Sequence, residues 1–424
     1  MNTTPSPEPS RPGAAARPVT RRTLMRGGAL GVFGAIFLSA CSQGEQSAQG
    51  DPSASPQGSS SPTPTSAAST APPALTVEPE DGAQQVNPVA PVRVSADRGA
   101  LERVDLTGPA GPVEGEMSED GRTWTASGPL DFNAAYTLSY AAADGTDRSE
   151  GERTFSTVTP ELEANATLNV VDGGTYGTGQ IIQFSFSEPV SRKAEVEQAI
   201  SVTGGGVAAG RFRWYSDTLM RYRPPEKWAP HSRVEVAADL LGVDFGNGMI
   251  GNENTRLAFA TGAKHYAVVE NSDKVLRVFV DDRLVEEFPA TLGNEDWPSV
   301  TGELVIMEQQ AKYSFNPKSL GLTKDDPHWY EPFDASWTSR LTRSGVFVHQ
   351  ALPSAIPLLG VANVSHGCIG LPPEGARYIF ENFRVGDVIE AKGTGYPEAD
   401  PDDGFGDWNI PFEHYADAAW KGNW

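Results

Sequence analysis

One cysteine near the C-terminal end is surrounded by residue types that support covalent catalysis. The chain has only two cysteines, and Cys368 lies in the run Ser365-His366-Gly367-Cys368, with His349 upstream of it. A cysteine is a useful nucleophile as its thiolate, and a neighbouring imidazole both lowers the thiol pKa and accepts its proton. This combination predicts acyl transfer through a thioester, with His349 as the general base.

The residues around Cys368 also predict an oxyanion-binding turn. Glycine at 367 allows the backbone to turn tightly, so we expect the amide N–H groups of Gly367 and Cys368 to point at a developing oxyanion. A zinc site is the alternative, because His349, His366 and Cys368 are all possible ligands. Catalytic zinc sites usually contain a short-spaced pair such as H-E-x-x-H, which is absent, so we expect no metal and no other cofactor.

The motif resembles that of the L,D-transpeptidase family of cell-wall enzymes, whose catalytic domain is called YkuD. The family pattern is a histidine, a spacer, and Ser/Thr-His-Gly-Cys followed by a hydrophobic residue and Asn. Here His349 and the spacer 350–364 precede Ser365, and the position of the Asn is Gly370. The resemblance extends through Leu292-Gly293-Asn294-Glu295-Asp296-Trp297-Pro298, Gly386-Asp387-Val388-Ile389-Glu390 and Gly406-Asp407-Trp408-Asn409-Ile410-Pro411.

The resemblance implies a role for each residue of the site. Cys368 would attack a peptide carbonyl, and His349, oriented by the backbone carbonyl of Gln350, would take the thiol proton. The amides of His366, Gly367 and Cys368 would form the oxyanion hole. The long stretch 312–342 is predicted to be a lid. The residues implied in substrate binding are Ser365, Tyr330, Met307 and Gly370.

The same resemblance implies a substrate and a product. The donor would be a peptidoglycan tetrapeptide stem, held on Cys368 and passed to the side-chain amine of a second stem to form a 3→3 cross-link. Carbapenem β-lactams would acylate the same sulfur. Two alternatives stay open: an L,D-carboxypeptidase with water as acceptor, and a wall-binding scaffold lipoprotein with a weak or inactive third domain, for which Gly370 is the hint.

The N-terminal residues have the features of an export signal. An arginine-rich start is followed by the apolar stretch 27–40 and by Leu38-Ser39-Ala40-Cys41. The stretch is shorter than the roughly twenty residues that span a bilayer, so residues 1–41 are predicted to be a lipoprotein signal peptide and lipobox. Lipidation of Cys41 would anchor the protein to the cell membrane on the extracytoplasmic side, facing the cell wall. Export through the Sec or the twin-arginine route stays open.

Charge and cysteine usage limit the other partners. The formal net charge of −22 predicts that the protein does not bind nucleic acid. It also disfavours adhesion to anionic lipid, so membrane contact is expected through the lipid on Cys41. With Cys41 lipidated and Cys368 reactive, no cysteine pair is left for a disulfide.

The mature chain is predicted to be mainly β. Residues 42–74 contain no Leu, Ile, Val, Phe, Tyr or Trp and are predicted to be a disordered Ser/Pro/Ala linker. Short alternating runs then indicate two tandem immunoglobulin-like β-sandwich domains, at 75–159 and 160–263.

The third domain combines strands with one helix. Alternation of apolar residues predicts sheet at the start of a catalytic domain that covers residues 264–393. Apolar spacing after Pro372-Pro373 predicts a short helix at 374–383. Residues 394–424 are predicted to form a C-terminal extension that packs on the catalytic domain.

Overall fold

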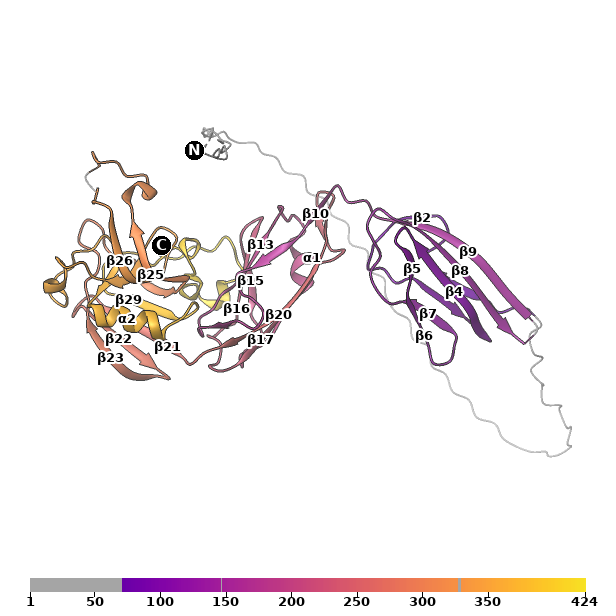
Figure 1. Ribbon diagram of the computed structural model, residues 1–424, viewed down its shortest axis with the longest axis horizontal. Coiled ribbons are helices and arrows are strands. Elements are labelled where there is room, and N and C mark those ends of the chain that lie inside the picture. Colours follow the sequence, from indigo (N-terminus) through magenta and orange to yellow (C-terminus); the bar gives the residue numbers. More distant parts are fainter. Residues whose placement is uncertain (1–70, 146, 327–328) are drawn as a thin grey trace, which may run out of the picture. The chain divides into compact units, whose positions relative to one another are not determined.

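The computed structural model of the protein describes residues 71–145, 147–326 and 329–424 (Figure 1). The predicted signal peptide with Cys41, and residues 42–70 of the predicted linker, lie outside the described residues. The described chain is mainly β, as the alternating sequence patterns predict, with two α-helices. None of its helices has the length and apolar character needed to cross a membrane.

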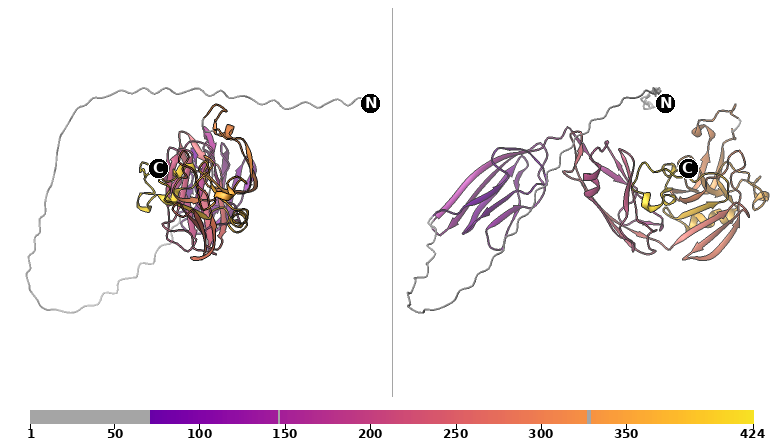
Figure 2. Two further views of the ribbon diagram at one scale, coloured as in Figure 1. Left: turned by 90° about the vertical axis from the view of Figure 1, so that its left-hand side faces the viewer. Right: turned by 180° about the vertical axis from the view of Figure 1, so that it is seen from behind.

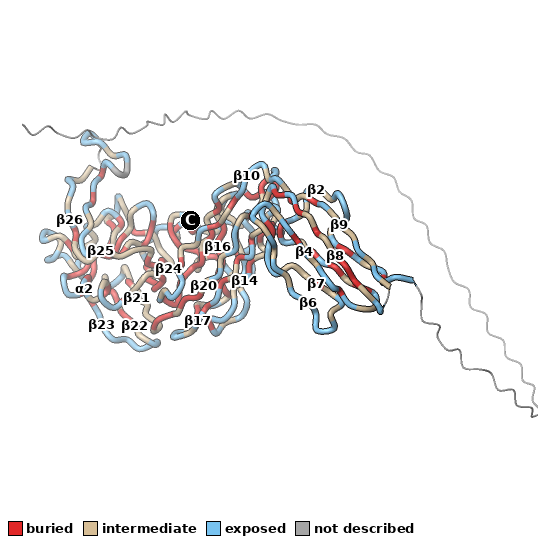
Figure 3. The backbone as a smooth tube through the Cα atoms, turned by 45° about the vertical axis from the view of Figure 1, so that its right-hand side comes forward, coloured by how far each residue is buried: buried red, intermediate tan, exposed pale blue. Residues whose placement is uncertain are grey.

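The first sandwich has two sheets, with strand orders β1-β3-β7-β6 and β2-β9-β8-β4-β5. Side chains such as Val94, Trp124 and Leu138 point inward and form the core between the sheets. The tube in Figure 3 shows this alternation of buried and exposed positions along the strands. The strands are β1 (Leu75–Glu78), β2 (Ala83–Val86), β3 (Arg93–Ala96), β4 (Ala100–Gly108), β5 (Gly111–Val113), β6 (Gly115–Met117), β7 (Thr123–Ala126), β8 (Ala135–Asp144) and β9 (Asp147–Thr157).

The second sandwich repeats this construction, with sheets β11-β13-β16-β15 and β12-β20-β17-β14 and a small sheet β10-β19-β18. Its core contains Phe184, Trp228 and Phe259. The elements are β10 (Leu162–Ala164), β11 (Ala166–Leu168), β12 (Thr175–Tyr176), β13 (Ile182–Phe186), α1 (Lys193–Gln198), β14 (Ile200–Gly204), β15 (Arg211–Ser216), β16 (Leu219–Arg223), β17 (Arg233–Asp239), β18 (Asp244–Gly246), β19 (Met249–Gly251) and β20 (Asn254–Thr261).

The third domain, for which a catalytic role is predicted, contains two further sheets, β23-β22-β21-β29-β24 and β25-β26-β27-β28. The loop at the tip of the β25–β26 hairpin extends away from both sheets (Figures 1 and 2). The strands are β21 (His265–Glu270), β22 (Val275–Val280), β23 (Arg283–Pro289), β24 (Gly302–Val305), β25 (Glu308–Phe315), β26 (Phe333–Arg340), β27 (Phe347–Gln350), β28 (Ile369–Leu371) and β29 (Val388–Lys392).

Helix α2 (Pro373–Asn382) forms where the sequence predicts a helix. Pro373 suits the first helical position, because its φ is already helical and its missing N–H would have no partner there. Ala376 and Ile379 are buried on one face and join the core of the domain. Short 3₁₀ turns complete the chain at Pro317–Leu320, Ile356–Leu358, Pro401–Asp403, Asp407–Asn409 and Phe412–His414.

Four arginines on one face of the second sandwich bind the C-terminal segment. In the β15–β16 pair, Arg211 lies opposite Arg223 and Arg213 lies opposite Arg221; these four residues are called the arginine cluster below. Directly opposed like charges destabilise a sheet unless other groups compensate them. Backbone carbonyls from the segment 401–420 accept hydrogen bonds from all four guanidinium groups and supply that compensation.

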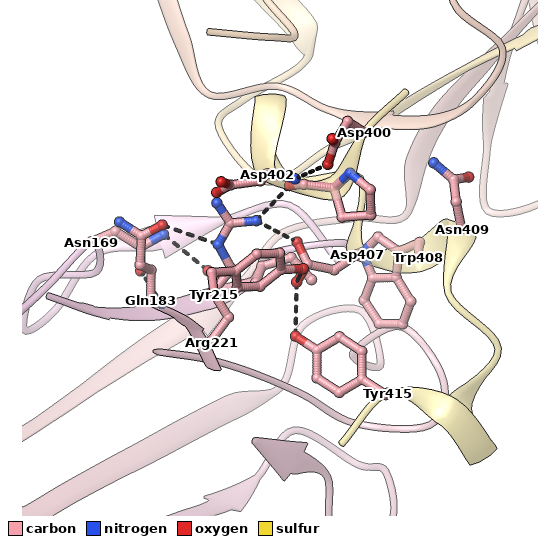
Figure 4. A network of polar contacts seen from close by, with 12 residues as sticks. Asn169, Gln183, Tyr215, Arg221, Asp400, Asp402, Asp407, Trp408, Asn409 and Tyr415 are labelled. Atoms are coloured by element: carbon pink, nitrogen blue, oxygen red, sulfur yellow. Dashed lines mark hydrogen bonds and ion pairs between the residues drawn. The ribbon is translucent and has the colours of Figure 1, made fainter. Parts of the chain in front are cut away.

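Arg221 is the centre of this contact (Figure 4). Its Nη1 lies 2.7 Å from Pro401 O and 2.9 Å from Asp407 Oδ2, and both charged side chains are fully buried. The hydroxyl groups of Tyr215 and Tyr415 donate to Asp407 Oδ1 at 2.7 and 2.8 Å. Burial and the nearby carboxylate raise the pKa of both tyrosines, so both remain donors. The charges of Arg221 and Asp407 are therefore buried as a pair, although Arg221 Nη2 has no hydrogen-bond partner among the described residues.

A buried carboxyl group precedes β29. Asp387 Oδ2 accepts from Arg384 N at 2.9 Å, whereas Oδ1 has no hydrogen-bond partner among the described residues. Burial raises the pKa of Asp387 to about 7, although the Arg384 N–H opposes the rise. The second sandwich touches this turn directly, since a Cβ on Gly177 would lie 2.1 Å from Asp387 N. The charge of Arg384 also opposes the rise, but the effect of burial on the pKa of Asp387 is larger.

Candidate active site

Cys368 and His349 lie on neighbouring strands. Cys368 directly precedes β28, which pairs in parallel with β27, and the register places His349 opposite Gly370. Two residues earlier on each strand, the same register places Cys368 beside Phe347. Residues two apart on a strand share a face, so the thiol and the imidazole project to the same side of the sheet. Gly370 has no side chain that could fill the space next to His349.

Both side chains line one cavity of about 820 Å³. The cavity is formed by β27, the catalytic motif, the tip of the β25–β26 hairpin and the loop that precedes Ser365. Most of the site residues predicted from the sequence come together here. The predicted residues that line it are His349, Cys368, Ser365, His366, Gly367, Gly370 and Tyr330.

Aromatic rings surround the two reactive groups. The imidazole of His349 lies 5.4 Å from the ring of Phe315 and 6.4 Å from that of Phe333, centroid to centroid. Cys368 packs on the cluster that contains Phe315 and Phe347. Burial in these surroundings lowers the pKa of His349 and opposes its protonation. The imidazole is therefore neutral at neutral pH and able to accept a proton.

A single hydrogen bond sets the tautomer of His349. Its Nδ1 lies 2.8 Å from Gln350 O, the contact that the family resemblance implies. A carbonyl oxygen only accepts, so Nδ1 carries the proton and donates it. In the neutral ring, Nε2 then has the free lone pair. His349 is thus held in the form that a general base requires.

The resting thiol is not ionised. Burial raises the pKa of Cys368 to about 11, and the backbone N–H of Phe347 only partly opposes this effect. The Sγ atom lies 3.5 Å from Gly345 O, a contact in which the S–H is the donor. The expectation that the imidazole lowers this pKa is therefore wrong for the resting site, because desolvation exceeds the effect of a neutral histidine. Proton transfer must accompany the attack.

The turn before Cys368 differs from the prediction in one donor. The Gly367 N–H was expected to face the oxyanion, but it donates to Ser365 Oγ at 3.2 Å. That hydroxyl donates in turn to Cys368 O at 2.6 Å. Ser365 therefore closes the turn, and the Gly367 amide is a structural support instead of an oxyanion donor. Gly367 has a φ of +105°, which a residue with a side chain rarely adopts.

His366 contacts aromatic rings. Its imidazole centroid lies 5.4 Å from that of Tyr330 and 6.1 Å from that of Trp297. In the part of the chain that the structure describes, no three His, Cys, Asp or Glu side chains are grouped so that they could hold a metal ion.

The predicted lid is shorter than the sequence suggests. Strands β25 and β26 extend into the stretch 312–342 from both ends, and the described residues of the connection between them are 316–326 and 329–332. The loop does reach the cavity, since Tyr330 lines it and packs on Phe333. The many aromatic and Pro residues of this stretch were interpreted as a loop. Tyr and Phe also favour strands, which is why the ends of the stretch are β25 and β26.

Met307 lies elsewhere, and its assignment to the substrate pocket is wrong. It does not line the cavity and instead packs in a cluster with Ile181, Val388 and Phe405, where the second sandwich meets the catalytic domain. Its position just after β24 directs it to this contact.

Gly370, which stands where the family has asparagine, packs against Thr291. A Cβ at 370 would lie 2.8 Å from Thr291 Cγ2, so a larger residue requires Thr291 to move. Thr291 is buried; its hydroxyl donates to Ala362 O at 2.9 Å and accepts from Val364 N at 3.0 Å. Thr291 therefore holds the loop that leads into the catalytic motif, in the space beside Gly370.

Three further residues around the motif were not predicted. Gly345 and Phe347 contact the thiol through their main chain, and Ser299 bonds to Gly367 O. Main-chain contacts of this kind leave no signal in residue types. Ser299 adjoins the stretch 292–298 that carries the family resemblance, which was the only indication that it lies near the site.

Comparison with known proteins identifies the domains. Residues 264–390 match the L,D-transpeptidase catalytic domain (YkuD), and residues 83–244, which span parts of both sandwiches, match a bacterial Ig domain. The chain is 32% identical to L,D-transpeptidase 2 of Mycobacterium tuberculosis over 347 residues, which cover 81% of this chain and 84% of that protein.

Two further similarities were found. L,D-transpeptidase 5 of Mycobacterium tuberculosis is 30% identical over 351 residues, covering 80% of this chain and 76% of that protein. The solved structure of the L,D-transpeptidase LdtMt1 in complex with imipenem is 28% identical and covers 55% of this chain and 100% of its own, with a TM-score of 0.47. On the strength of the sequence identities, this chain belongs to the L,D-transpeptidase family.

Proposed function

We propose that the protein is a cysteine-dependent L,D-transpeptidase that forms 3→3 cross-links between peptidoglycan stem peptides. One observation carries the proposal: Cys368 lines the same cavity as His349, whose Nδ1–H bond to Gln350 O leaves Nε2 free as a base. This arrangement supplies a nucleophile and the group that activates it. Family membership supplies the reaction class.

In the first step, the Cys368 sulfur attacks the carbonyl carbon of the donor stem while its proton moves to His349 Nε2. The carbonyl oxygen becomes an oxyanion, which a main-chain N–H stabilises. Collapse of this intermediate breaks the C–N bond, and the leaving amine takes the proton back from Nε2. The products are a thioester on Cys368 and a free amino acid.

In the second step, the side-chain amine of another stem attacks the thioester carbon and gives a proton to Nε2. The C–S bond breaks, and the proton returns to the sulfur to restore the neutral pair. The aromatic rings of Phe315 and Phe333 line the cavity and support an amine acceptor over water, because they limit the water near the thioester. Transfer to the amine is therefore favoured over hydrolysis.

The high thiol pKa fits this sequence of proton transfers. Since the pKa of Cys368 is raised to about 11, few resting molecules carry a thiolate. The sulfur becomes strongly nucleophilic only when an acyl carbonyl is in place and His349 receives the proton. Because the Cys368 thiol and the His349 imidazole are both uncharged at rest, the thiol reacts mainly with bound acyl substrates.

The same site is proposed to react with carbapenem β-lactams. Attack of Cys368 on the lactam carbonyl forms a thioester and breaks the ring C–N bond, and the ring nitrogen takes the proton from His349. The nitrogen stays attached to the acyl group and remains in the site. Hydrolysis is slow for the reason given above, so the adduct persists.

The protein is proposed to act outside the cytoplasm while anchored to the membrane by lipid on Cys41. The support is the run Leu38-Ser39-Ala40-Cys41 after an apolar stretch. Expression of the full chain and of Cys41→Ala in an actinobacterial host tests this proposal. The wild type is expected in the membrane fraction and the variant in the soluble fraction, and equal fractionation would contradict the anchor.

The catalytic proposal is tested with purified protein and disaccharide-tetrapeptide. Mass spectrometry is expected to detect a cross-linked dimer and the released amino acid for the wild type, and neither for Cys368→Ala. Thermal unfolding of the variant serves as the control, because removal of one sulfur should leave the fold intact. A carbapenem is expected to add one adduct, located on the peptide that contains Cys368.

Each alternative predicts a different product. A tripeptide without dimer would indicate an L,D-carboxypeptidase. Folded wild type that gives no product and no adduct would indicate a scaffold protein. Activity that persists in Cys368→Ala would refute the proposed mechanism.

A further inference from the structure

We propose that Ser299 is a positioning residue that sets the oxyanion hole, an inference that rests on the proposed function. Ser299 lies in the connection between β23 and β24 and is 1% exposed. Its hydroxyl accepts from Gly293 N at 2.9 Å and donates to Gly367 O at 2.8 Å. Because Gly293 N–H can only donate and Gly367 O can only accept, the direction of the hydroxyl proton is fixed.

The bond to Gly367 O fixes the peptide plane between residues 367 and 368. In a trans peptide, the carbonyl oxygen and the following N–H point in opposite directions. Gly367 O points to the buried Ser299, which does not line the cavity, so the Cys368 N–H points to the opposite side. Among the described residues, no backbone carbonyl accepts from this N–H. The Cys368 amide is thus the main-chain donor for the oxyanion.

Without the Ser299 hydroxyl, the bonds of Ser365 to Gly367 N and Cys368 O remain, but the Gly367 carbonyl loses the hydrogen bond that orients it. Gly367 has a φ of +105° and no side chain, and a Cβ built on it would meet nothing within 4 Å, so side-chain sterics do not fix the backbone at this residue. A flipped peptide would turn the Gly367 carbonyl towards the developing oxyanion and its N–H away. Such a flip would replace a stabilising donor by a repelling dipole.

The segment that carries Ser299 is itself well anchored. A Cβ on Gly293 would lie 2.0 Å from Trp297 O, which shows how tightly the segment folds back on itself. Its main chain pairs with the start of the catalytic motif: Ser365 N donates to Leu292 O at 3.1 Å, and Asn294 N donates to Ser365 O at 3.0 Å. Ser299 therefore holds the motif from a rigid base.

Pre-steady-state kinetics of Ser299→Ala test the inference. The rate constant of carbapenem acylation and the kcat of transpeptidation are expected to fall between about tenfold and the 10²–10³-fold that loss of an oxyanion donor costs. KM for the donor stem should change little, because the donor acts on the transition state. Ser299→Thr keeps the hydroxyl and is expected to restore most of the rate.

Thr338→Val is the matched control. Thr338 is 1% exposed, and its hydroxyl donates to Gln310 O at 2.9 Å, away from the cavity. The Thr338→Val substitution removes an equally buried hydroxyl and is expected to keep the wild-type acylation rate. Equal losses in Thr338→Val and Ser299→Ala, or a change confined to KM, would overturn the inference.

A second measurement does not depend on the folding of a variant. In full-length protein labelled with ¹⁵N-cysteine, the Cys368 amide proton is expected to shift downfield on acylation, as its N–H bonds to the thioester oxygen. An unchanged shift in acylated wild type would overturn the role of Ser299. Wild type that never forms an adduct would instead contradict the proposed function, so the two failures are distinguishable.

Discussion

In the cavity of the third domain, the buried His349 and the half-buried Cys368 have no charged partner among the described residues, whereas Arg221 and Asp407 are buried as a pair at the contact with the second sandwich. In the cavity, desolvation moves both pKa values towards the neutral forms. At the arginine cluster, a backbone carbonyl and the Asp407 carboxylate accept hydrogen bonds from the buried Arg221 guanidinium, and tyrosine hydroxyls donate to the same carboxylate. The first arrangement leaves proton transfer available, and the second fixes the positions of two elements.

The difference shows two ways in which a protein can accommodate the free-energy cost of burying an ionisable group. A buried ionisable group either loses its charge or must be surrounded by compensating groups. A group of the first kind can still exchange a proton with a substrate. A group of the second kind is too well compensated to do so, and its removal affects stability instead of catalysis.

The largest effect is expected from Asp407→Ala. This change leaves the guanidinium of Arg221 buried without its carboxylate, and breaking a buried pair on one side typically costs about 3–5 kcal/mol. Chemical denaturation of the variant measures the loss. Tyr215→Phe is the matched control, since it removes only one hydrogen bond to Asp407 and should cost about 1 kcal/mol. Equal stability of Asp407→Ala and wild type would remove the distinction between the two regions.

The second prediction concerns Asp387, which belongs with the uncompensated groups. Its folded pKa of about 7 lies above the unfolded value of about 3.9, so the folded state binds an extra proton between these values. The resulting stability is complete below the unfolded pKa and is lost as the pH rises through 7. From pH 5 to pH 8, wild type should therefore lose about 3 kcal/mol relative to Asp387→Asn. Parallel pH profiles for the two proteins would contradict this assignment.

The smallest effect is spectroscopic and leaves stability unchanged. The ultraviolet absorbance of the Cys368 thiolate, taken as wild type minus Cys368→Ala, is expected to be absent at neutral pH and to rise only towards pH 11. The lowered pKa of His349 keeps the imidazole neutral through the same range. Thiolate absorbance already present at pH 7 would indicate a preformed ion pair with His349 and would place the cavity among the charged sites.

The sequence was informative where chemistry depends on contiguous residues. The motif around Cys368, the spacing to His349 and the carbonyl of Gln350 are local features, and the structure brings them together. The Gly367 amide and Met307 were misassigned because their partners, Ser365 Oγ and the second sandwich, are set by tertiary folding.

Two kinds of feature lie beyond residue types altogether. The thiol pKa depends on how completely the aromatic rings exclude water, which no local pattern encodes. The arginine cluster depends on strand register: the β15 and β16 sequences contain the arginines, but only the pairing of Arg213 with Arg221 shows that they share a face.

The arginine cluster recognises the C-terminal segment mainly through backbone carbonyls, at Pro401, Ile410 and Asp417 among others. Apart from Asp407, recognition of this kind tolerates changes of composition in the segment but not changes of length, since one inserted residue displaces every later carbonyl. It also makes the two modules interdependent. A catalytic domain transplanted onto a β-sandwich without these arginines would keep its motif and lose the support of its C-terminal segment.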